Sequence, residues 1–132
     1  ELLVGTHNFT ATTGNTFKIA LFTSDASLGA GTTAYSTSNE ITNSSGTAYT
    51  AGGATLTSVT PTTSGTTALC DFADVSYTSA SFTANGALIY NSSASDKAVC
   101  AIAFGSDKTV TSGTFTIQFP TADATNAIIR LA

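Results

Sequence analysis

Residues 16–22 read TFKIALF, and this stretch decides the class of fold. Its apolar residues alternate, so that Phe17, Ile19 and Leu21 share one face. Such alternation is typical of a β-strand with one buried face, whereas a helix repeats its apolar residues every three or four positions. Residues 81–90, SFTANGALIY, alternate in the same way from Phe82 onward. These two segments predict an all-β domain.

Similar segments recur along the rest of the chain. We expect seven strands, at residues 16–22, 55–59, 66–75, 81–90, 97–104, 114–119 and 127–131. Clusters of Ser, Asn, Asp and Gly at 91–96 and 105–108 predict turns between them. Pro61 and Pro120 fall at strand edges, where a missing N–H does no harm. The prediction is a single antiparallel β-sandwich of immunoglobulin-like or jelly-roll type, with little helix.

The inward faces of these strands supply the predicted core. A chain of 132 residues is long enough to bury one core of ordinary size in a single domain. The residues expected to fill it are Phe17, Ile19, Leu21, Phe72, Phe82, Leu88, Tyr90, Ile102, Phe104, Phe115, Ile117, Phe119 and Ile129.

Residues 29–50 depart from the strand pattern. Apart from Ile41 they hold almost no aliphatic side chain, and they are rich in Ser, Thr, Asn and Gly. A connection longer than about 12–15 residues without structure is usually functional or an extension. Two interpretations stay open: a polar arm that contacts a neighbouring molecule, or a mobile loop with one short edge strand at 40–42.

The composition restricts the kind of partner. About one residue in three is Ser or Thr, whereas charged residues make up 9% and the net charge is −4. Nucleic acid is not expected, because phosphate binding needs clustered Lys and Arg and this chain has four, scattered along its length. No apolar run approaches the roughly 20 residues of a membrane-spanning helix, so no membrane partner is expected either. This composition favours a structural or binding role over catalysis.

Residues suited to catalysis are sparse. His7 is the only histidine, and no carboxylate lies close to it in sequence. Asp71 and Asp74 lie close together, but no aromatic platform accompanies them as in a glycosidase cleft. No Asp-rich loop matches the calcium-binding pattern of an EF-hand. We therefore expect a protein that is not an enzyme and that uses no cofactor and no metal.

Cys70 and Cys100 are the only two cysteines, and each lies in an apolar, strand-like stretch. They could bridge two sheets, as in antibody domains. The alternative, which we favour, is two buried free thiols acting as small apolar side chains, because a domain of this size does not need a disulfide.

Several runs spread over most of the chain carry a family resemblance. They are FKIALFTS at 17–24, TTAY at 32–35, NEI at 39–41, YTAGGATL at 49–56, DFAD at 71–74, TANGALIYNS at 83–92, FGSDK at 104–108 and GTFTIQFP at 113–120. In these runs the chain resembles a family of small virion proteins of tailed bacteriophages. The resemblance implies a structural component of a virion and leaves its position on the particle open.

Within such a particle, we expect a capsid decoration (cement) protein that stabilises the outer shell. Its partners would be the major capsid protein and further copies of itself, as a homo-oligomer and possibly a trimer. The alternative is a tail- or fibre-associated module that contacts the host surface. The residues predicted to make contacts are Leu2, Leu3 and Val4 at the N-terminal end, and Tyr35, Ile41 and Tyr49 in the polar segment.

Overall fold

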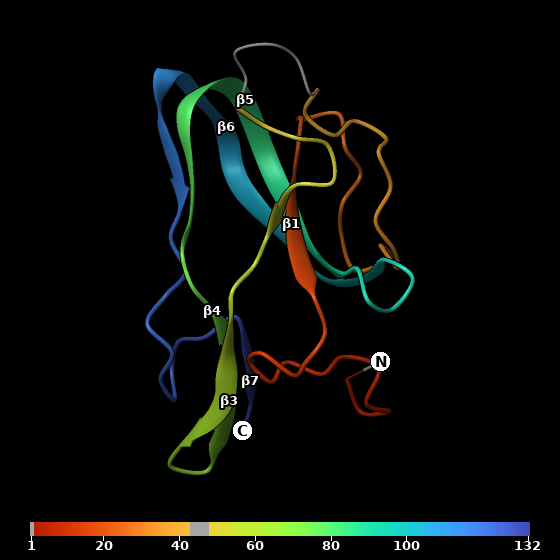
Figure 1. Ribbon diagram of the computed structural model, residues 1–132, viewed down its shortest axis with the longest axis vertical. Coiled ribbons are helices and arrows are strands. Elements are labelled where there is room, and N and C mark those ends of the chain that lie inside the picture. Colours follow the sequence, from red (N-terminus) through yellow and green to blue (C-terminus); the bar gives the residue numbers. More distant parts are fainter. Residues whose placement is uncertain (1, 43–47) are drawn as a thin grey trace.

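The computed structural model describes residues 2–42 and 48–132, and β-strands dominate it (Figure 1). The strands are β1 (Phe17–Phe22), β2 (Ala54–Thr55), β3 (Ser58–Ser64), β4 (Thr67–Phe72), β5 (Val75–Asn91), β6 (Lys97–Ile117) and β7 (Ile129–Leu131). No helix occurs in these two ranges, so they contain no apolar helix of membrane-spanning length. The predicted all-β fold with little helix is confirmed.

The strands form two antiparallel sheets, in the orders β2-β1-β5-β6 and β3-β4-β7. β1 pairs with β5 along its whole length, from Phe17 opposite Asn91 to Phe22 opposite Gly86. β3 is an edge strand and contains Pro61, next to a shift in register. The sequence predicted Pro61 at the edge of a strand, between those at 55–59 and 66–75, and this is wrong because it lies inside β3. An edge strand tolerates a proline where its missing N–H would face away from the partner strand.

β5 and β6 form one long hairpin that bends over the upper end of the molecule in Figure 1. Irregularities in register mark the bent region, and Ser79, Gly105 and Ser112 there have φ angles of 53°, 78° and 46°. Bulges of this kind bend a strand and increase its twist without ending it. Continuous strands that bend at bulges can thus pass from one layer of a sandwich to the other.

Several of the strand boundaries predicted from the sequence are wrong. The predicted strand at 66–75 ends at Phe72, and β5 already begins at Val75, so that no break separates it from the predicted strand at 81–90. The predicted turn at 105–108 is a bulge inside β6, where residues 104–107 lie opposite Asn85 and pairing resumes between Lys108 and Ala84. Gly105 allows this because its left-handed φ angle kinks the strand at no steric cost. The predicted strand at 55–59 is divided between β2 and β3, because Leu56 is buried and its N–H donates to the Phe17 carbonyl, 2.8 Å away.

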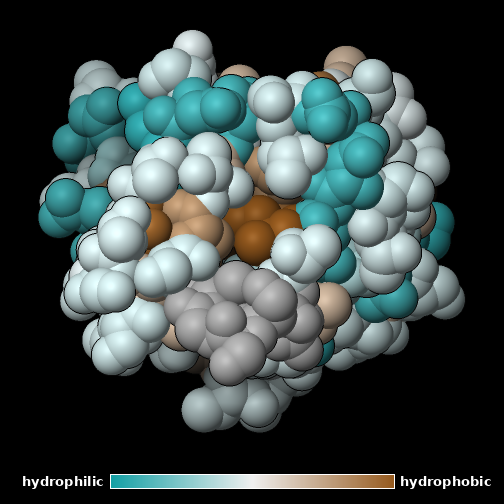
Figure 2. All heavy atoms as spheres, turned by 90° about the horizontal axis from the view of Figure 1, so that it is seen from above, coloured by the Kyte–Doolittle hydropathy of each residue, from teal (hydrophilic) through white to brown (hydrophobic). Residues whose placement is uncertain are grey.

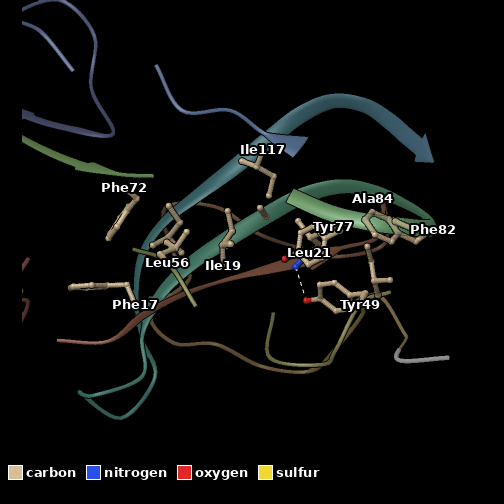
Figure 3. Packing of buried hydrophobic residues seen from close by; sticks show 14 of the residues in the cluster. Phe17, Ile19, Leu21, Tyr49, Leu56, Phe72, Tyr77, Phe82, Ala84 and Ile117 are labelled. Carbon is tan, nitrogen blue, oxygen red and sulfur yellow. Dashed lines mark hydrogen bonds between the residues drawn. The ribbon is translucent and has the colours of Figure 1, made fainter. Parts of the chain in front are cut away.

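The main core contains the inward face of β1 (Figure 3). Phe17 stacks on Phe9 with the ring centroids 4.6 Å apart, and it also contacts Phe72. Six of the predicted core residues are buried in this cluster: Phe17, Ile19, Leu21, Phe72, Phe82 and Ile117. Five others are only partly buried against it: Ile102, Phe104, Phe115, Phe119 and Ile129.

A second, smaller cluster lies on the opposite face of the first sheet, which we call the covered face. It consists of Ala20, Phe22, Leu88 and Tyr90, with Ala26, Leu28, Tyr35 and Ala98 packed against it. The prediction that Leu88 and Tyr90 share a face with Phe82 is therefore wrong. Ala84 and Ala87, three residues apart, both belong to the main core, so β5 changes phase between them. Both faces of β5 are consequently buried near its end.

Candidate interaction surface

The polar segment is held against the first sheet by one buried acid. The carboxylate of Glu40 accepts hydrogen bonds from the Tyr35 and Tyr49 hydroxyls, at 2.6 Å each, and from the Gly52 N–H at 2.7 Å. The Tyr49 hydroxyl also accepts a hydrogen bond from the Leu21 N–H of β1, 2.9 Å away (Figure 3). Three donors satisfy this carboxylate, as a buried charge requires.

The tyrosines around Glu40 complete the covered face. Tyr35 stacks on Tyr90 with the ring centroids 4.5 Å apart, and the Tyr90 hydroxyl donates to the Gly52 carbonyl at 2.7 Å. Burial and the neighbouring Glu40 raise the pKa of both Tyr35 and Tyr49 well above the usual range. Burial, helped by Asp96 and Glu40, raises the pKa of Tyr90 to about 12. All three hydroxyls are therefore neutral donors at ordinary pH.

This geometry corrects the contact residues predicted in the polar segment. Ile41 and Tyr49 are buried, 5% and 1% exposed, and Tyr35 is half-buried under Tyr90, so none of the three is an exposed contact. The reason is the anchor at Glu40, which turns these side chains inward. Bridges from Phe22 to Glu40 and from Ala34 to Lys97 tie the same segment to the sheet. Residues 43–47 of the predicted arm lie outside the described residues.

The N-terminal end does expose apolar side chains. Leu2, Leu3 and Val4 are 42%, 93% and 80% exposed, and they form a turn that the Gly5 N–H closes on the Leu2 carbonyl. They account for three of the five large apolar side chains exposed in the described ranges. The turn precedes His7, which is buried and hydrogen-bonded to Asn91 of β5, 3.0 Å away. The segment thus projects from a fixed point.

A second apolar surface runs along β6, and we call it the open flank. β6 is the outermost strand of its sheet, and among the described residues its outer edge is bridged only at Lys97. Beside this edge lies a groove of about 660 Å³ between the two halves of β6 and the segment that follows it. Its apolar lining includes Cys100, Ile102, Phe104, Phe115, Ile117, Phe119, Pro120 and Ile128.

The open flank is apolar because the sandwich ends there with its interior partly uncovered. Ile102 and Phe104 come from the first half of β6, Phe115 from the second half, and Phe119 from just beyond the strand, and all four are half-buried. Lys108 is the one charged residue among the described residues that line the groove, and its ammonium donates to Ser106. Such an apolar groove beside an unpaired strand edge suits an extended peptide segment better than a small polar substrate.

The upper end of the molecule is also hollowed. Figure 2 shows hydrophobic side chains at the floor of a depression there, bordered by side chains of intermediate to hydrophilic character on the sides that are not drawn in grey. This is the end over which the β5–β6 hairpin bends in Figure 1. Apart from the turn at residues 2–4, the apolar surfaces of the open flank and of this end thus lie where strands bend or end.

The side chains of the residues considered for catalysis make hydrogen bonds within the fold. His7 is buried against Asn91, and the Asp74 carboxylate accepts the Phe119 N–H at 2.8 Å. The Asp71 carboxylate accepts the N–H of the next residue, Phe72. Within the described ranges, no group of three or more His, Cys, Asp or Glu residues is arranged to hold a metal ion.

Both cysteines are free thiols, which is the interpretation the sequence favoured. Cys70 lies on β4 and Cys100 on β6, and each is half-buried. Burial raises the pKa of the Cys70 thiol, and it raises that of Cys100 to about 11. Both thiols are therefore protonated and slow to react at neutral pH.

The chain stands apart in comparisons with known proteins: no family model, no curated protein and no solved structure matches it. Its function must be argued from its own surfaces. Of these, the exposed turn at residues 2–4 was predicted from the sequence, and the open flank was not. Its signal was the spacing of apolar residues on both sides of 105–108, followed by only one short predicted strand, at 127–131.

Proposed function

We propose that this protein is a structural component of a tailed-phage virion, a decoration protein that coats and stabilises the outer capsid surface. The open flank is the observation that carries the proposal, because half-buried apolar side chains beside an unpaired strand edge form a surface for docking another protein. The resemblance of the sequence to small virion proteins of tailed bacteriophages supports a phage particle as the assembly to which the protein binds. The partners are the major capsid protein and further copies of the chain.

A coat of many copies does not need one strong site. Each apolar contact is modest, but a homo-oligomer that engages several capsid subunits gains avidity from its multiplicity. Ligands that bind only the assembled shell stabilise it by mass action. The neutral, hydroxyl-rich surface suits this role, since 9% charged residues leave little for ion pairing with the shell.

The test is decoration of particles that lack this protein. Undecorated particles should lose their integrity at a lower temperature than particles to which the purified protein has been added back. A matched pair of variants locates the contact: Ile102→Asp places a charge in the groove of the open flank, whereas Val59→Asp alters an exposed residue of β3. Ile102→Asp should abolish the protection and Val59→Asp should keep it. Equal heat resistance with and without the protein would contradict the proposed function.

Salt dependence tests the apolar character of the attachment. Screening weakens contacts between charges, so an apolar attachment should change by less than about tenfold between roughly 0.05 and 0.5 M salt. A binding isotherm to undecorated capsids at both concentrations measures this. An affinity that falls more than about a hundredfold would show that charged residues carry the contact.

Copy number separates this proposal from the tail-associated alternative. A decoration protein should be present in hundreds of copies per particle, and a tail or fibre module in about a dozen, when gel staining is calibrated against the major capsid protein. Sugar binding at a host surface would call for exposed aromatic rings. Tyr49, Tyr77 and Tyr90 are buried and Tyr35 is half-buried against Tyr90, so these tyrosines do not form an exposed stacking platform.

A further inference from the structure

The bulge in β6 lies opposite a chemically reactive step in β5. Asn85 and Gly86 form the only Asn-Gly pair in the sequence, and residues 104–107 of β6 lie opposite Asn85. Asparagine is a thermolabile residue, because the next backbone nitrogen can attack its side-chain amide. A glycine in the next position favours the attack, since it has no Cβ to hinder the ring that forms. Asn85 is therefore the asparagine of this chain with the least hindered neighbour.

Packing requires the glycine at position 86. A Cβ there would lie 2.9 Å from the Ile102 carbonyl oxygen, closer than real Cβ atoms come to a backbone atom. The close approach of β6 thus excludes every larger residue after Asn85. Protection of the Asn85 amide has to come from elsewhere in the fold.

One hydrogen bond controls where the Asn85 amide points. Its Nδ2 donates to Oδ1 of Asp107 on β6, 2.8 Å away. For the attack, Cγ of Asn85 must turn along its own strand toward the Gly86 nitrogen, and this rotation breaks the bond. Hydrogen bonds to an ionised acceptor are among the stronger ones in proteins. Asp107 therefore holds the amide away from the nitrogen that would attack it.

The backbone around Gly86 needs only a local opening to permit the attack. The pair between Phe22 and Gly86 is the last one of the β1–β5 ladder. On the other side, the pairing of β5 with β6 is irregular between Ala84 and Gly86. The ends of ladders open at a lower cost than the whole fold. Asn85 is also half-buried, so that water reaches it.

We propose that Asn85 is a site of spontaneous deamidation, which Asp107 slows by holding the side-chain amide. The Gly86 backbone nitrogen forms a bond to Cγ of Asn85, the bond from Cγ to Nδ2 breaks, and the proton of the Gly86 N–H leaves with the amide as ammonia. The product is a cyclic succinimide. Water then opens either side of the ring and gives aspartate or isoaspartate at position 85. No oxidant, reductant or enzyme takes part, and the inference does not rest on the proposed function.

The new acid would change the bulge. The Asn85 amide donates to Asp107, whereas an ionised aspartate at the same position has no hydrogen to donate. Two like charges facing each other across a strand pair are destabilising. The bulge connects the two halves of β6 that line the open flank, so each deamidated chain would carry an altered flank and one additional negative charge.

The first experiment incubates the folded full-length protein at mildly alkaline pH and locates the exchange of NH₂ for OH by peptide mass spectrometry. We expect Asn85 to be modified before any other asparagine. Asp107→Ala should speed its modification about tenfold, which matches the strength of a hydrogen bond to a charged group. Asp107→Asn, which keeps a neutral acceptor, should give a rate between the two. Circular dichroism verifies that each variant is folded.

Asn126 is the matched control. Its amide also donates to a carboxylate, that of Asp123, but the next residue is Ala127. Asp123→Ala should therefore leave Asn126 unmodified over the same time. Equal rates at Asn85 in the wild type, Asp107→Asn and Asp107→Ala would overturn the proposal, as would modification of Asn85 only in unfolded protein.

The second experiment measures the effect of the product on the fold. Asn85→Asp and Asn85→Ser both remove the amide donor, but only Asn85→Asp adds a charge. Chemical denaturation at neutral pH should give a lower midpoint for Asn85→Asp, and the difference should disappear in an Asp107→Ala background. Equal midpoints for the two variants would overturn the predicted change of the bulge.

Discussion

The covered face and the open flank are two apolar surfaces of the same sheet that differ in how completely their side chains are buried. On the covered face, Phe22, Leu88 and Tyr90 are 2%, 1% and 3% exposed, because the polar segment is fastened over them by Glu40. On the open flank, Ile102 and Phe104 stay half-buried because the segment after β6 lines one side of the groove and does not cover them. The difference shows how much one buried charge contributes in this weakly charged chain. The Glu40 carboxylate holds the polar segment over the covered face through its three hydrogen bonds.

The largest expected effect separates the closed core from the open flank by one substitution made in both places. Phe17→Ala removes a fully buried ring that contacts Phe9 and Phe72, and it should lower the free energy of unfolding by about 4 kcal/mol. Phe104→Ala removes a half-buried ring and should cost only about 1 kcal/mol in the monomer. Chemical denaturation of both variants gives the two values. Equal losses would mean that the flank is as closed as the core.

Removal of the anchor should open the covered face. Glu40→Ala leaves the Tyr49 hydroxyl and the Gly52 N–H without their acceptor, and we expect a loss of about 3 kcal/mol. Glu40→Gln keeps the shape and one carbonyl acceptor, so its loss should be smaller. Asp25→Ala, which alters an exposed acid, is the control. If Glu40→Ala behaves like Asp25→Ala, the segment is held by something other than this carboxylate.

Alkaline pH should lower the free energy of unfolding, because it ionises a tyrosine of the main core and a tyrosine of the covered face. Burial raises the pKa of Tyr77 and Tyr90 to about 12, from an ordinary value of 10.0. Folding therefore favours the neutral hydroxyls, and this stabilisation is complete below pH 10 and lost as the pH rises toward 12. At about pH 11 each tyrosine should lower the free energy of unfolding by on the order of 1 kcal/mol.

Denaturation at about pH 8 and pH 11 checks the alkaline loss, with tyrosine ionisation followed by absorbance. Burial also raises the pKa of both thiols, so their ionisation destabilises the fold with the same sign, and the comparison is made with both cysteines replaced by Ala. Tyr90→Phe should then reduce the pH dependence. An unchanged dependence would assign the alkaline loss to other groups.

The smallest effect concerns the bulge that separates the two halves of the flank. Gly105 has a φ of +78° with open space around it, so Gly105→Ala meets no clash but must hold a left-handed backbone. The expected cost is about 1 kcal/mol. Gly29→Ala is the matched control, because Gly29 also has open space but does not have a left-handed φ, and it should be neutral or slightly stabilising. A neutral Gly105→Ala would mean that the bulge can relax.

What the sequence could and could not predict follows from how local each signal is. β1 was predicted almost to the residue, because alternation over 17–22 depends only on which residues are adjacent. The continuity of β6 was missed, because Gly, Ser and Asp at 105–107 are equally suited to a hairpin turn and to a bulge. Only the partner strand decides between the two, and the partner is distant in sequence.

The candidate site divides in the same way. Exposure of Leu2, Leu3 and Val4 was predictable, because nothing near them in sequence continues the strand pattern. Burial of Tyr49 was not, since it depends on a carboxylate nine residues away in a segment without periodicity. Burial of both faces of β5 was missed, because the prediction assigned one inward face and did not use the run of apolar residues from Ala87 to Tyr90, which is typical of strands covered on two sides.

The long β5–β6 hairpin also has a consequence for the order in which the protein folds. Its pairs extend from Asn91 and Lys97, separated by a short turn, to Val75 and Ile117 at the far end. Each new pair closes only a short additional loop, so the ribbon can zip up from its turn within microseconds to milliseconds, whereas β1 must close a loop of roughly 70 residues to reach β5. We expect the ribbon to be structured in the transition state before β1 docks. Changes near residues 91–97 should then mainly slow folding, and changes in β1 should mainly speed unfolding.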